Sequence, residues 1–427
     1  MDHPTRARDR NSCGLRGLPT GANFPSFGQF YPRLGIFFPS VDVNSFSFAP
    51  TSQRQFPRAY INPEATLVAM VGSEQDELEV GEKISIKDIL YESRFFIVNL
   101  LGIIGFVWMF YELITGLGNP HRFFCGFSML VVCLLNCYWR MFFVTGFRHR
   151  YFSHRAFKNK VPRWLKWLIR TPHHEERYLR GMQMLEAFFA TADAQKGVIW
   201  WASHHRHHHK FSDTVDDLHS FEFVRNETGS FWKGFYHSHV KWVLIKKYKK
   251  ADYDKVPDLK KYPELMFFEK ARGYLIAPIL LGVACFFLGI GMGIGGWAML
   301  FGGFFASTFL TYHFTFFINS LAHMMGAARF DTGEASKNCG WLNWFTMGEG
   351  WHNNHHHKDI AAAQAILPEE ERSDVTYQIL LILEKMDLIK IAYKYTEDDI
   401  AEARRLDSLA RQNRGLKKRE LATAEAS

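Results

Sequence analysis

FFIVNLLGIIGFVWMFYELITG, residues 95–116, and FFCGFSMLVVCLLNCYWRMFFVTGF, residues 123–147, are the two stretches that decide the fold. The first contains one charged side chain, Glu112, and the second contains only Arg140. A helix needs about 20 mostly apolar residues to cross the hydrocarbon core of a bilayer. Buried helices of soluble domains rarely extend this far without charge. Both stretches are therefore predicted to be transmembrane helices.

A third apolar run, residues 273–319, contains no Asp, Glu, Lys or Arg. It is long enough for two spans, and the glycine-rich GIGMGIGG at 289–296 can supply the reversal between them. We predict these spans at about 274–295 and 297–319. The predicted fold is an all-α integral membrane protein with four transmembrane helices in two hairpins.

Basic residues indicate how these helices are oriented. Lys and Arg are concentrated after the second span, in residues 148–163, and before the third, in residues 246–250, whereas the short turns hold only Arg122. By the positive-inside rule, the large hydrophilic part is cytosolic. The formal net charge is +8, which nucleic-acid binding could also explain. No recognisable nucleic-acid module accompanies it, so we predict a lipid bilayer and no nucleic acid as partner.

The composition of the 427 residues excludes other classes of protein. With 47% hydrophobic residues and six Cys, the chain is neither disordered throughout, nor collagen-like, nor a disulfide scaffold. Residues 1–85 are interpreted as an N-terminal extension, either disordered or a targeting segment, because residues 1–60 are rich in Arg and poor in acids. Residues 86–396 form the predicted membrane domain, and 397–427 a charged, solvated C-terminal tail.

Most of the 20 His residues occur in four clusters. These are HRYFSH at 149–154, HHRHHH at 204–209, His323 four residues after Asn319, and HNNHHH at 352–357. All four lie at or beyond the same predicted end of the helical bundle, so their side chains can converge.

Spacing indicates which imidazoles can share a metal. Helical positions three and four apart lie on one face, as in the HxxHH patterns that begin at His205 and His352. His149 and His154 are five apart and converge only if their helix bends or ends between them. Imidazole suits Zn, Cu, Fe and Ni, so the ligand type alone does not identify the metal. The two HxxHH patterns together with His149, His154 and His323 give nine candidate ligands. Nine are too many for one tetrahedral zinc and suit two metals. The HExxH motif of zinc proteases is absent.

Carboxylates near the clusters are candidates for orienting the metal-bound rings from behind. An all-imidazole shell brings no negative charge to two divalent ions, so acidic neighbours are expected. Ordinary solvated acids are the alternative for each of them. The candidates are Asp213, Asp216, Asp217, Asp331 and Glu349.

Taken together, four motifs resemble those of a family of membrane fatty acid desaturases. The family is that of the Δ9-type acyl-CoA desaturases, which are stearoyl-CoA desaturase-like. The motifs are GFRHRYFSHRAFK, WWASHHRHHHKFSD, FFINSLAHMMGAARFDTG and GEGWHNNHHH. The resemblance runs from the first span to about residue 395. It implies a four-span fold with a cytosolic helical cap that holds a histidine-rich di-iron site, with two Fe²⁺ ions.

The resemblance also implies individual roles. The implied metal ligands are His149, His154, His205, His208, His209, His323, His352, His355 and His356. Asn319 matches a residue that contacts iron through water. The implied outer contacts are Asp216, Asp217, His219 and Glu349. The sequence departs from the family at Leu218, where a Pro is expected, and in residues 170–183, which we interpret as an insertion whose His173 and His174 are solvated.

The implied reaction removes two hydrogens from adjacent methylenes of a long-chain acyl-CoA. No acid or base side chain can abstract such a hydrogen, so no catalytic residue is expected beyond the metal centre, where O₂ supplies the oxidant. Electrons are expected from cytochrome b5 or ferredoxin with its reductase. The expected location is the endoplasmic reticulum with a cytosolic active site, or a plastid membrane if the N-terminus is a transit peptide.

Five aromatic or polar residues are candidates for the acyl tunnel or the cap, with ordinary core packing as the alternative for each. They are Gln195, Trp200, Trp201, Trp232 and Trp242. Two rival functions stay open at this point. A di-iron hydroxylase or ketolase could use nearly the same motifs, and a non-catalytic metal-binding membrane protein could keep them without turnover.

Overall fold

The computed structural model describes residues 86–270 and 272–425. The predictions for residues 1–85 lie outside the described residues. The described part is mostly helical, as predicted. After the short helix α2 (Ile86–Tyr91), a helical hairpin forms from α3 (Ser93–Thr115) and α4 (Pro120–Phe142), with the 3₁₀ turn η2 (Gly116–Gly118) between them. Asn119 caps α4 by accepting the backbone N–H groups of His121 and Arg122.

The second hairpin starts with η7 (Gly273–Leu275) and α12 (Ile276–Gly291). The chain then reverses at Gly293 and Gly295, whose φ values of 72° and 93° are in the left-handed region that favours glycine. The return helix is continuous and consists of α13 (Gly296–Met299), the π-helical segment η8 (Leu300–Phe305) and α14 (Ala306–Met324). The two predicted hairpins are thus present as pairs of helices.

Within the described residues, three helical segments are long and apolar enough to cross a membrane: Ser93–Gly118, Pro120–Ser153 and Gly273–Gly291. The fourth predicted span, in the return helix, does not meet this standard because it contains Ser, Thr and His side chains. These hydroxyls are bonded inside the helix: those of Thr311 and Thr315, for example, donate to the carbonyls of Ser307 and Thr311 at 2.7 and 2.8 Å. That this helix crosses the membrane stays a prediction.

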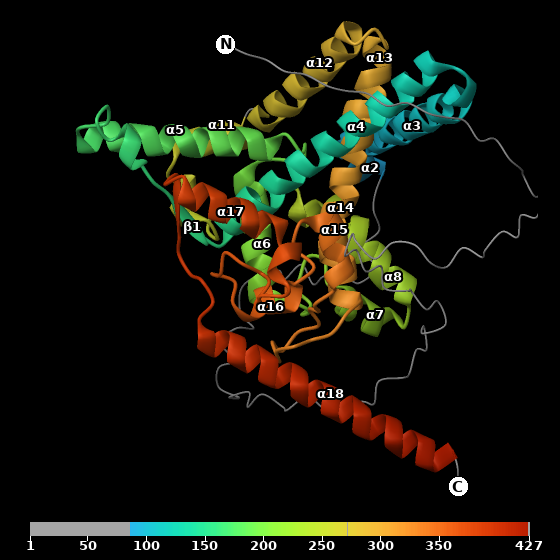
Figure 1. The fold of residues 1–427 in the computed structure, drawn as a ribbon, viewed down its shortest axis with the longest axis vertical. Helices are drawn as coiled ribbons and strands as arrows, with labels where there is room; N and C mark the ends of the chain where they lie inside the picture. The colour runs from blue at the N-terminus through green and yellow to red at the C-terminus, as the bar shows by residue number, and fades with distance from the viewer. Residues whose placement is uncertain (1–85, 271, 426–427) are drawn as a thin grey trace, which may run out of the picture. The chain divides into compact units, whose positions relative to one another are not determined.

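The helices of the two hairpins pack against one another (Figure 1). A Cβ added at Gly105 of α3 would lie 2.2 Å from the carbonyl oxygen of Phe301, so only glycine allows this approach. The turns of the two hairpins lie at the same end, where the His121 ring nitrogen Nε2 is 3.3 Å from the carbonyl oxygen of Gly293. The histidine clusters lie at the other end of the helices.

We refer to the remaining elements together as the cap. Its first half contains the π-helical segment η3 (Phe143–Ser153), β1 (Phe157–Asn159), η4 (Arg163–Leu165), α5 (Pro172–Thr191), α6 (Val198–Phe211), α7 (Phe221–Thr228) and α8 (Phe231–Tyr236). It continues with η5 (His237–Lys241), α9 (Trp242–Leu244), η6 (Lys246–Tyr248), α10 (Pro257–Lys260) and α11 (Pro263–Glu269). After α14 follow η9 (Gly340–Leu342), α15 (Asn343–Thr346), α16 (His352–His357), η10 (Glu371–Ser373), α17 (Val375–Lys385), β2 (Ile389–Ile391) and α18 (Glu397–Glu425).

The core of the cap is apolar and joins elements far apart in sequence. β1 and β2 pair antiparallel, with Phe157 opposite Ile391. The fully buried side chains of Phe152, Ile199 and Leu265 belong to the same cluster as Phe157. This packing fixes η3 and α6, which carry two of the histidine clusters, relative to each other.

Two predictions about the cap can be compared with the structure. Most of the segment 170–183 forms the first part of α5, which begins at Pro172 and is capped by Thr171, and the side chains of His173 and His174 are exposed as predicted. The C-terminal tail is mostly exposed, but its first turns are not free. Ala403 of α18 is buried, and Asp407 accepts two hydrogen bonds from the Arg329 guanidinium.

Candidate metal centre

The first histidine cluster lies at the end of η3, which continues α4 without a break in the helix and ends just before His154. Here the turns widen to a π-helix, and the N–H of His154 bonds the carbonyl of His149, five residues before it, at 3.2 Å. The two imidazole rings therefore lie on one side, with centroids 5.0 Å apart. We expected a bend or an end of the helix between them. The widened turn achieves the same convergence.

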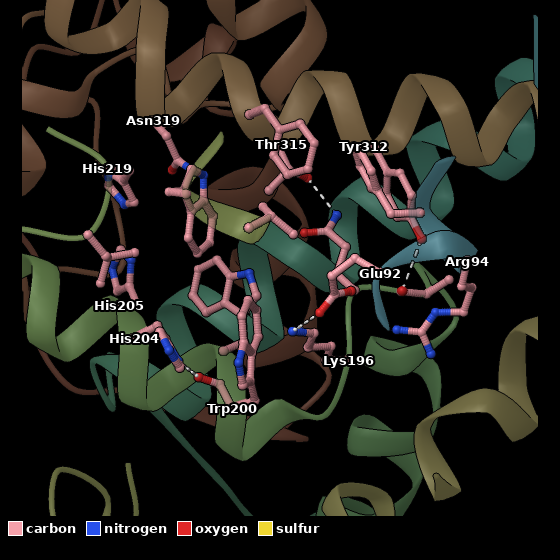
Figure 2. Close-up of a pocket in the computed structure, with 18 residues that line it drawn as sticks. Glu92, Arg94, Lys196, Trp200, His204, His205, His219, Tyr312, Thr315 and Asn319 are labelled. Atoms are coloured by element: carbon pink, nitrogen blue, oxygen red, sulfur yellow. Dashed lines mark hydrogen bonds and ion pairs between the residues drawn. The ribbon is translucent and has the colours of Figure 1, made fainter. Parts of the chain in front are cut away.

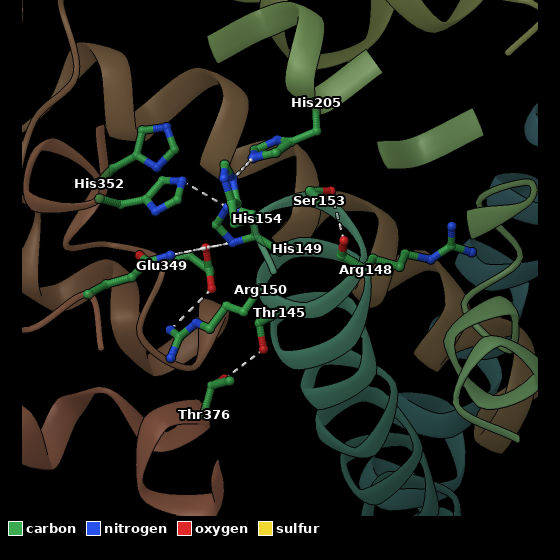
Figure 3. Close-up of polar contacts among 12 residues, drawn as sticks. Thr145, Arg148, His149, Arg150, Ser153, His154, His205, Glu349, His352 and Thr376 are labelled. Carbon is green, nitrogen blue, oxygen red and sulfur yellow. Dashed lines mark hydrogen bonds and ion pairs between the residues drawn. The ribbon is translucent and has the colours of Figure 1, made fainter. Parts of the chain in front are cut away.

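Five of the nine predicted ligands form one group, in which the ring nitrogens lie within 4.8 Å of one another. The members of this group, which we call site A, are His149, His154, His205, His209 and His355. They come from η3, α6 and α16. Their Nε2 atoms face each other, with His149 2.9 Å from His355 and His154 2.7 Å from His205. Figure 3 shows His149, His154 and His205 meeting in this way.

The other four predicted ligands form a second group, site B. Its members are His208, His323, His352 and His356, from α6, α14 and α16. The Nε2 atom of His352 lies 3.1 Å from those of both His323 and His356. The Nε2 atom of His208 is buried and has no hydrogen-bond partner among the described residues. The structure therefore brings together all nine histidines that the sequence singled out, in two neighbouring sites.

Carboxylates bond the far side of several rings. The Nδ1 atom of His149 is 2.6 Å from Glu349, and that of His208 is 2.9 Å from Asp217. With a proton on Nδ1, the Nε2 atom of each ring presents a lone pair. Two lone pairs that face each other at hydrogen-bond distance repel unless a proton or a cation lies between them. The donor set therefore fits metal ions, one in each site.

Metal binding requires neutral rings, and burial favours the neutral form of several of them, whereas at His323 the carboxylates of Asp213 and Glu334 outweigh burial and raise the pKa. Burial lowers the pKa of His154 to about 4 and the pKa values of His205 and His356 well below the ordinary value of 6.5. Burial alone would raise the pKa of Asp217, but the hydrogen bonds from the His208 ring and from the backbone N–H of Asp213 hold it well below its usual range. The carboxylate therefore stays ionised as an acceptor for the ring.

The predicted outer residues are not all in place. Asp217, Glu349 and His219 lie beside the sites, and the His219 ring is 4.2 Å from the His208 ring. The side chain of Asp216 is exposed, and its carbonyl oxygen contacts His207, which is not among the nine predicted ligands, at 2.7 Å. Asp216 lies one residue before the inward-facing Asp217, which is why sequence proximity was misleading.

Two carboxylates that reach the sites were not predicted. Glu334 lies 3.8 Å from Nδ1 of His323 and 3.6 Å from that of His356, while Asp359 lies 3.4 Å from that of His154. Asp359 follows the HNNHHH motif by two residues, which is a signal that could have found it. Glu334 is in a loop, and no sequence pattern indicated it. Asp331, the candidate in the same loop, is exposed.

A second layer of buried charge holds Glu349 in place. The Arg150 guanidinium bonds Glu349 at 3.3 Å and Asp374 at 2.8 Å, and all three side chains are buried (Figure 3). The side-chain amide of Gln364 donates a further hydrogen bond to Glu349 at 2.6 Å. These contacts satisfy the carboxylate oxygens and fix the orientation of the His149 ring.

A cavity reaches site A from the side of α3. We call it the tunnel cavity; among its lining residues are Arg94, Lys196, Trp201, His205, Thr315 and Asn319. Figure 2 shows Asn319 and His205 at one end, and Lys196, Glu92 and Arg94 at the other. Of the five candidates, Gln195, Trp200, Trp201 and Trp242 line it, and Trp200 and Trp242 also belong to a buried apolar cluster, which is the alternative given for them. Trp232 is 73% exposed and is not among the lining residues.

Two apolar helical hairpins beside nine clustered imidazoles are typical of a membrane protein with a dinuclear, histidine-rich metal site. More particularly, the chain belongs to the fatty acid desaturase family, whose model matches residues 126–359. It is 32% identical over 243 residues to the sn-1 stearoyl-lipid 9-desaturase of Synechocystis sp., covering 57% of this chain and 64% of that relative.

Two plant relatives name different acyl carriers. The chain is 33% identical over 248 residues to the Delta-9 acyl-lipid desaturase 2 of Arabidopsis thaliana, covering 57% of this chain and 68% of the relative. It is 30% identical over 243 residues to the Acyl-CoA C20 Delta5-desaturase of Anemone leveillei, covering 56% of this chain and 65% of the relative.

Proposed function

We propose that this chain is an O₂-dependent fatty acyl desaturase that introduces a cis double bond at C9–C10 of a long-chain acyl substrate. The observation that carries the proposal is the pair of histidine sites at the end of an apolar tunnel cavity. Desaturation removes two hydrogens from neighbouring methylenes while O₂, two electrons and two protons from outside are converted to water. Cytochrome b5 or ferredoxin, with its reductase, is the proposed electron donor.

Two iron ions bound in sites A and B would supply the oxidant that cleavage of an unactivated C–H bond requires. The nine histidines are the proposed ligands, and Asn319 is the proposed contact through water. Glu349 and Asp217 keep the protons of His149 and His208 on Nδ1, so that Nε2 faces the metal. Trp201 and Thr315 line both the tunnel cavity and the small cavity beside sites A and B, where the reacting methylenes are positioned.

Two acyl carriers are candidates. An acyl-CoA is what the sequence motifs implied, and one relative is named for it. A membrane lipid is the second candidate, because two of the relatives above are named acyl-lipid desaturases. The membrane of the endoplasmic reticulum or of a plastid is the proposed location.

Expression of the full chain in a host that lacks its own desaturase tests the proposal. We expect chromatography of the fatty acid methyl esters to detect a new monounsaturated C16 or C18 acid, and a His356→Ala variant to produce none. A hydroxylated acid in its place would show that the chain is a hydroxylase. Growth rescue by His356→Ala equal to that by the wild type would favour a non-catalytic role.

A further inference from the structure

A second apolar cavity meets the tunnel cavity at Arg94 and Ala194, which line both. We call it the membrane groove, and its volume is about 390 Å³. One wall is α12, with Pro278, Ile279 and Val283, and the other wall is the return helix. In Figure 1, α12 meets α13 at one end and diverges from the other long helices toward α5, with which it is in contact.

The membrane groove is open along helices that otherwise expose apolar side chains. On α12, Ile279 is 60% exposed and Phe287 is 64% exposed, as expected of a surface that faces lipid tails. In the described lining of the groove, the side chains with a polar group are those of Arg94, Thr308 and Trp297. The Thr308 hydroxyl is already bonded to the carbonyl of Phe304. The groove therefore suits a hydrocarbon chain.

The junction between the two cavities is polar. Arg94 donates a hydrogen bond to the Tyr274 hydroxyl at 2.9 Å, and the Lys196 ammonium lies 3.1 Å from the Glu92 carboxylate (Figure 2). Both cations have further N–H groups that can donate to an oxygen of a ligand. A polar junction with donors, from which two apolar cavities diverge, matches a molecule with one polar centre and two hydrocarbon chains.

We propose that the substrate is a diacyl glycerolipid of the membrane. Its reacting chain occupies the tunnel cavity, its second chain occupies the membrane groove, and its ester oxygens accept hydrogen bonds from Arg94 and Lys196. This inference rests on the proposed function and names its substrate class. An acyl-CoA has one chain and makes no use of the membrane groove.

We expect the membrane groove to affect the positioning of the lipid substrate rather than its binding affinity. The second chain leaves lipid tails that are as apolar as the groove, so there is little hydrophobic gain. What the groove adds is van der Waals contact that fixes one chain, and with it the ester junction and the depth of the reacting chain. Filling the groove should therefore lower the turnover of a diacyl lipid selectively.

The full-length enzyme, reconstituted in lipid nanodiscs with an electron donor, tests this with two isotopically distinguishable substrates. One is a phosphatidylcholine with one deuterated stearoyl and one oleoyl chain, and the other is stearoyl-CoA. Val283→Trp projects into the groove, whereas Leu280→Trp is a matched control on the same helix that is 53% exposed and is not among the groove residues. We expect Val283→Trp to lower the ratio of lipid to CoA turnover at least tenfold and Leu280→Trp to leave it unchanged.

A second readout does not depend on activity. A phosphatidylcholine with a photoreactive diazirine in its oleoyl chain should label α12 between Pro278 and Phe287, and Val283→Trp should reduce that label. Turnover of stearoyl-CoA without turnover of the lipid, or a label on α12 that Val283→Trp does not reduce, would overturn this inference and leave the proposed function standing. A label that Val283→Trp reduces, with no unsaturated product from either substrate, would contradict the proposed function and support the lipid groove.

Discussion

Single residues of the metal centre differ in what they do for the imidazoles. Glu349 bonds Nδ1 of His149 at 2.6 Å from a buried position, and it is itself held by Arg150 and Gln364. Asp216 is the opposite case, since its side chain is exposed although it is adjacent to Asp217. A carboxylate acts on an imidazole of the metal centre by contacting Nδ1 of that ring. Closeness in sequence alone does not give this contact.

The first prediction follows from that contact. Glu349→Gln removes the negative charge behind His149, which weakens the ring as a metal donor, and outer-contact losses of this kind cost about 10- to 100-fold in metal affinity or activity. We expect purified Glu349→Gln to contain clearly less iron per protein than the wild type, measured by elemental analysis. Asp216→Asn is the matched control and should keep its iron. Equal iron contents in all three proteins would contradict the role of Glu349.

A second prediction concerns the buried Glu186 of α5. Burial raises its pKa to about 8 from the ordinary value of 4.5, although the Asn159 side chain donates to it at 2.8 Å. Between these two pH values the folded state keeps a proton that the unfolded state has lost. The free energy of unfolding contributed by this group therefore falls as the pH rises from about 4.5 to 8.

The Glu186→Gln variant has no such proton to lose. We expect its thermal midpoint in detergent to exceed that of the wild type at about pH 8, and the difference to shrink toward about pH 5. Glu176→Gln, an exposed position on the same helix, should show no such dependence. A difference between Glu186→Gln and wild type that is constant across this pH range would show that Glu186 does not titrate as described.

At the scale of elements, the sequence was sufficient to predict those features that a local sequence pattern encodes. Apolar length predicted the helices α3, α4 and α12, and the HxxHH spacing predicted which faces of α6 and α16 carry the rings. The widened turns of η3 were not predictable, because a π-helix has no spacing signal of its own in a single sequence. Glu334 was missed for a similar reason, since tertiary packing alone brings its loop to the centre.

The third prediction concerns the contact between η3 and the loop at residues 192–197. Arg148 is fully buried, pairs with Asp193 at 2.7 Å and donates to the carbonyls of Lys196 and Gly197. Arg148→Met leaves Asp193 without its partner in the interior, a change that typically costs about 3–5 kcal/mol. We expect a clearly lower thermal midpoint for Arg148→Met, whereas Arg163→Met, whose side chain is 84% exposed, should melt like the wild type. Equal midpoints for the two variants would contradict this assignment.

At the scale of the whole molecule, the fourth span distinguishes two membrane topologies. The return helix packs against α3 and α4 and runs from the hairpin turns to the metal centre, as a membrane span would. Its hydropathy is lower than that of the other three because its buried face carries residues such as Ser307, Thr308 and Thr311. Since these hydroxyls bond carbonyls of their own helix, their cost in a membrane is smaller than a hydropathy scale assumes.

The two topologies make opposite predictions about the C-terminus. With four spans, Leu117 in the α3–α4 turn and Arg411 in α18 lie on opposite sides of the membrane; with three, they lie on the same side. Both side chains are exposed, and the five described cysteines are all buried. In a background with Cys13→Ser, Leu117→Cys and Arg411→Cys should react with a membrane-impermeant maleimide from opposite sides of sealed vesicles.

Because the histidine sites combine rings from η3, α14 and α16, only the four-span arrangement lets α14 cross the membrane and still deliver His323 to the side where the other rings lie. Labelling of both positions from one side would therefore contradict the fourth span.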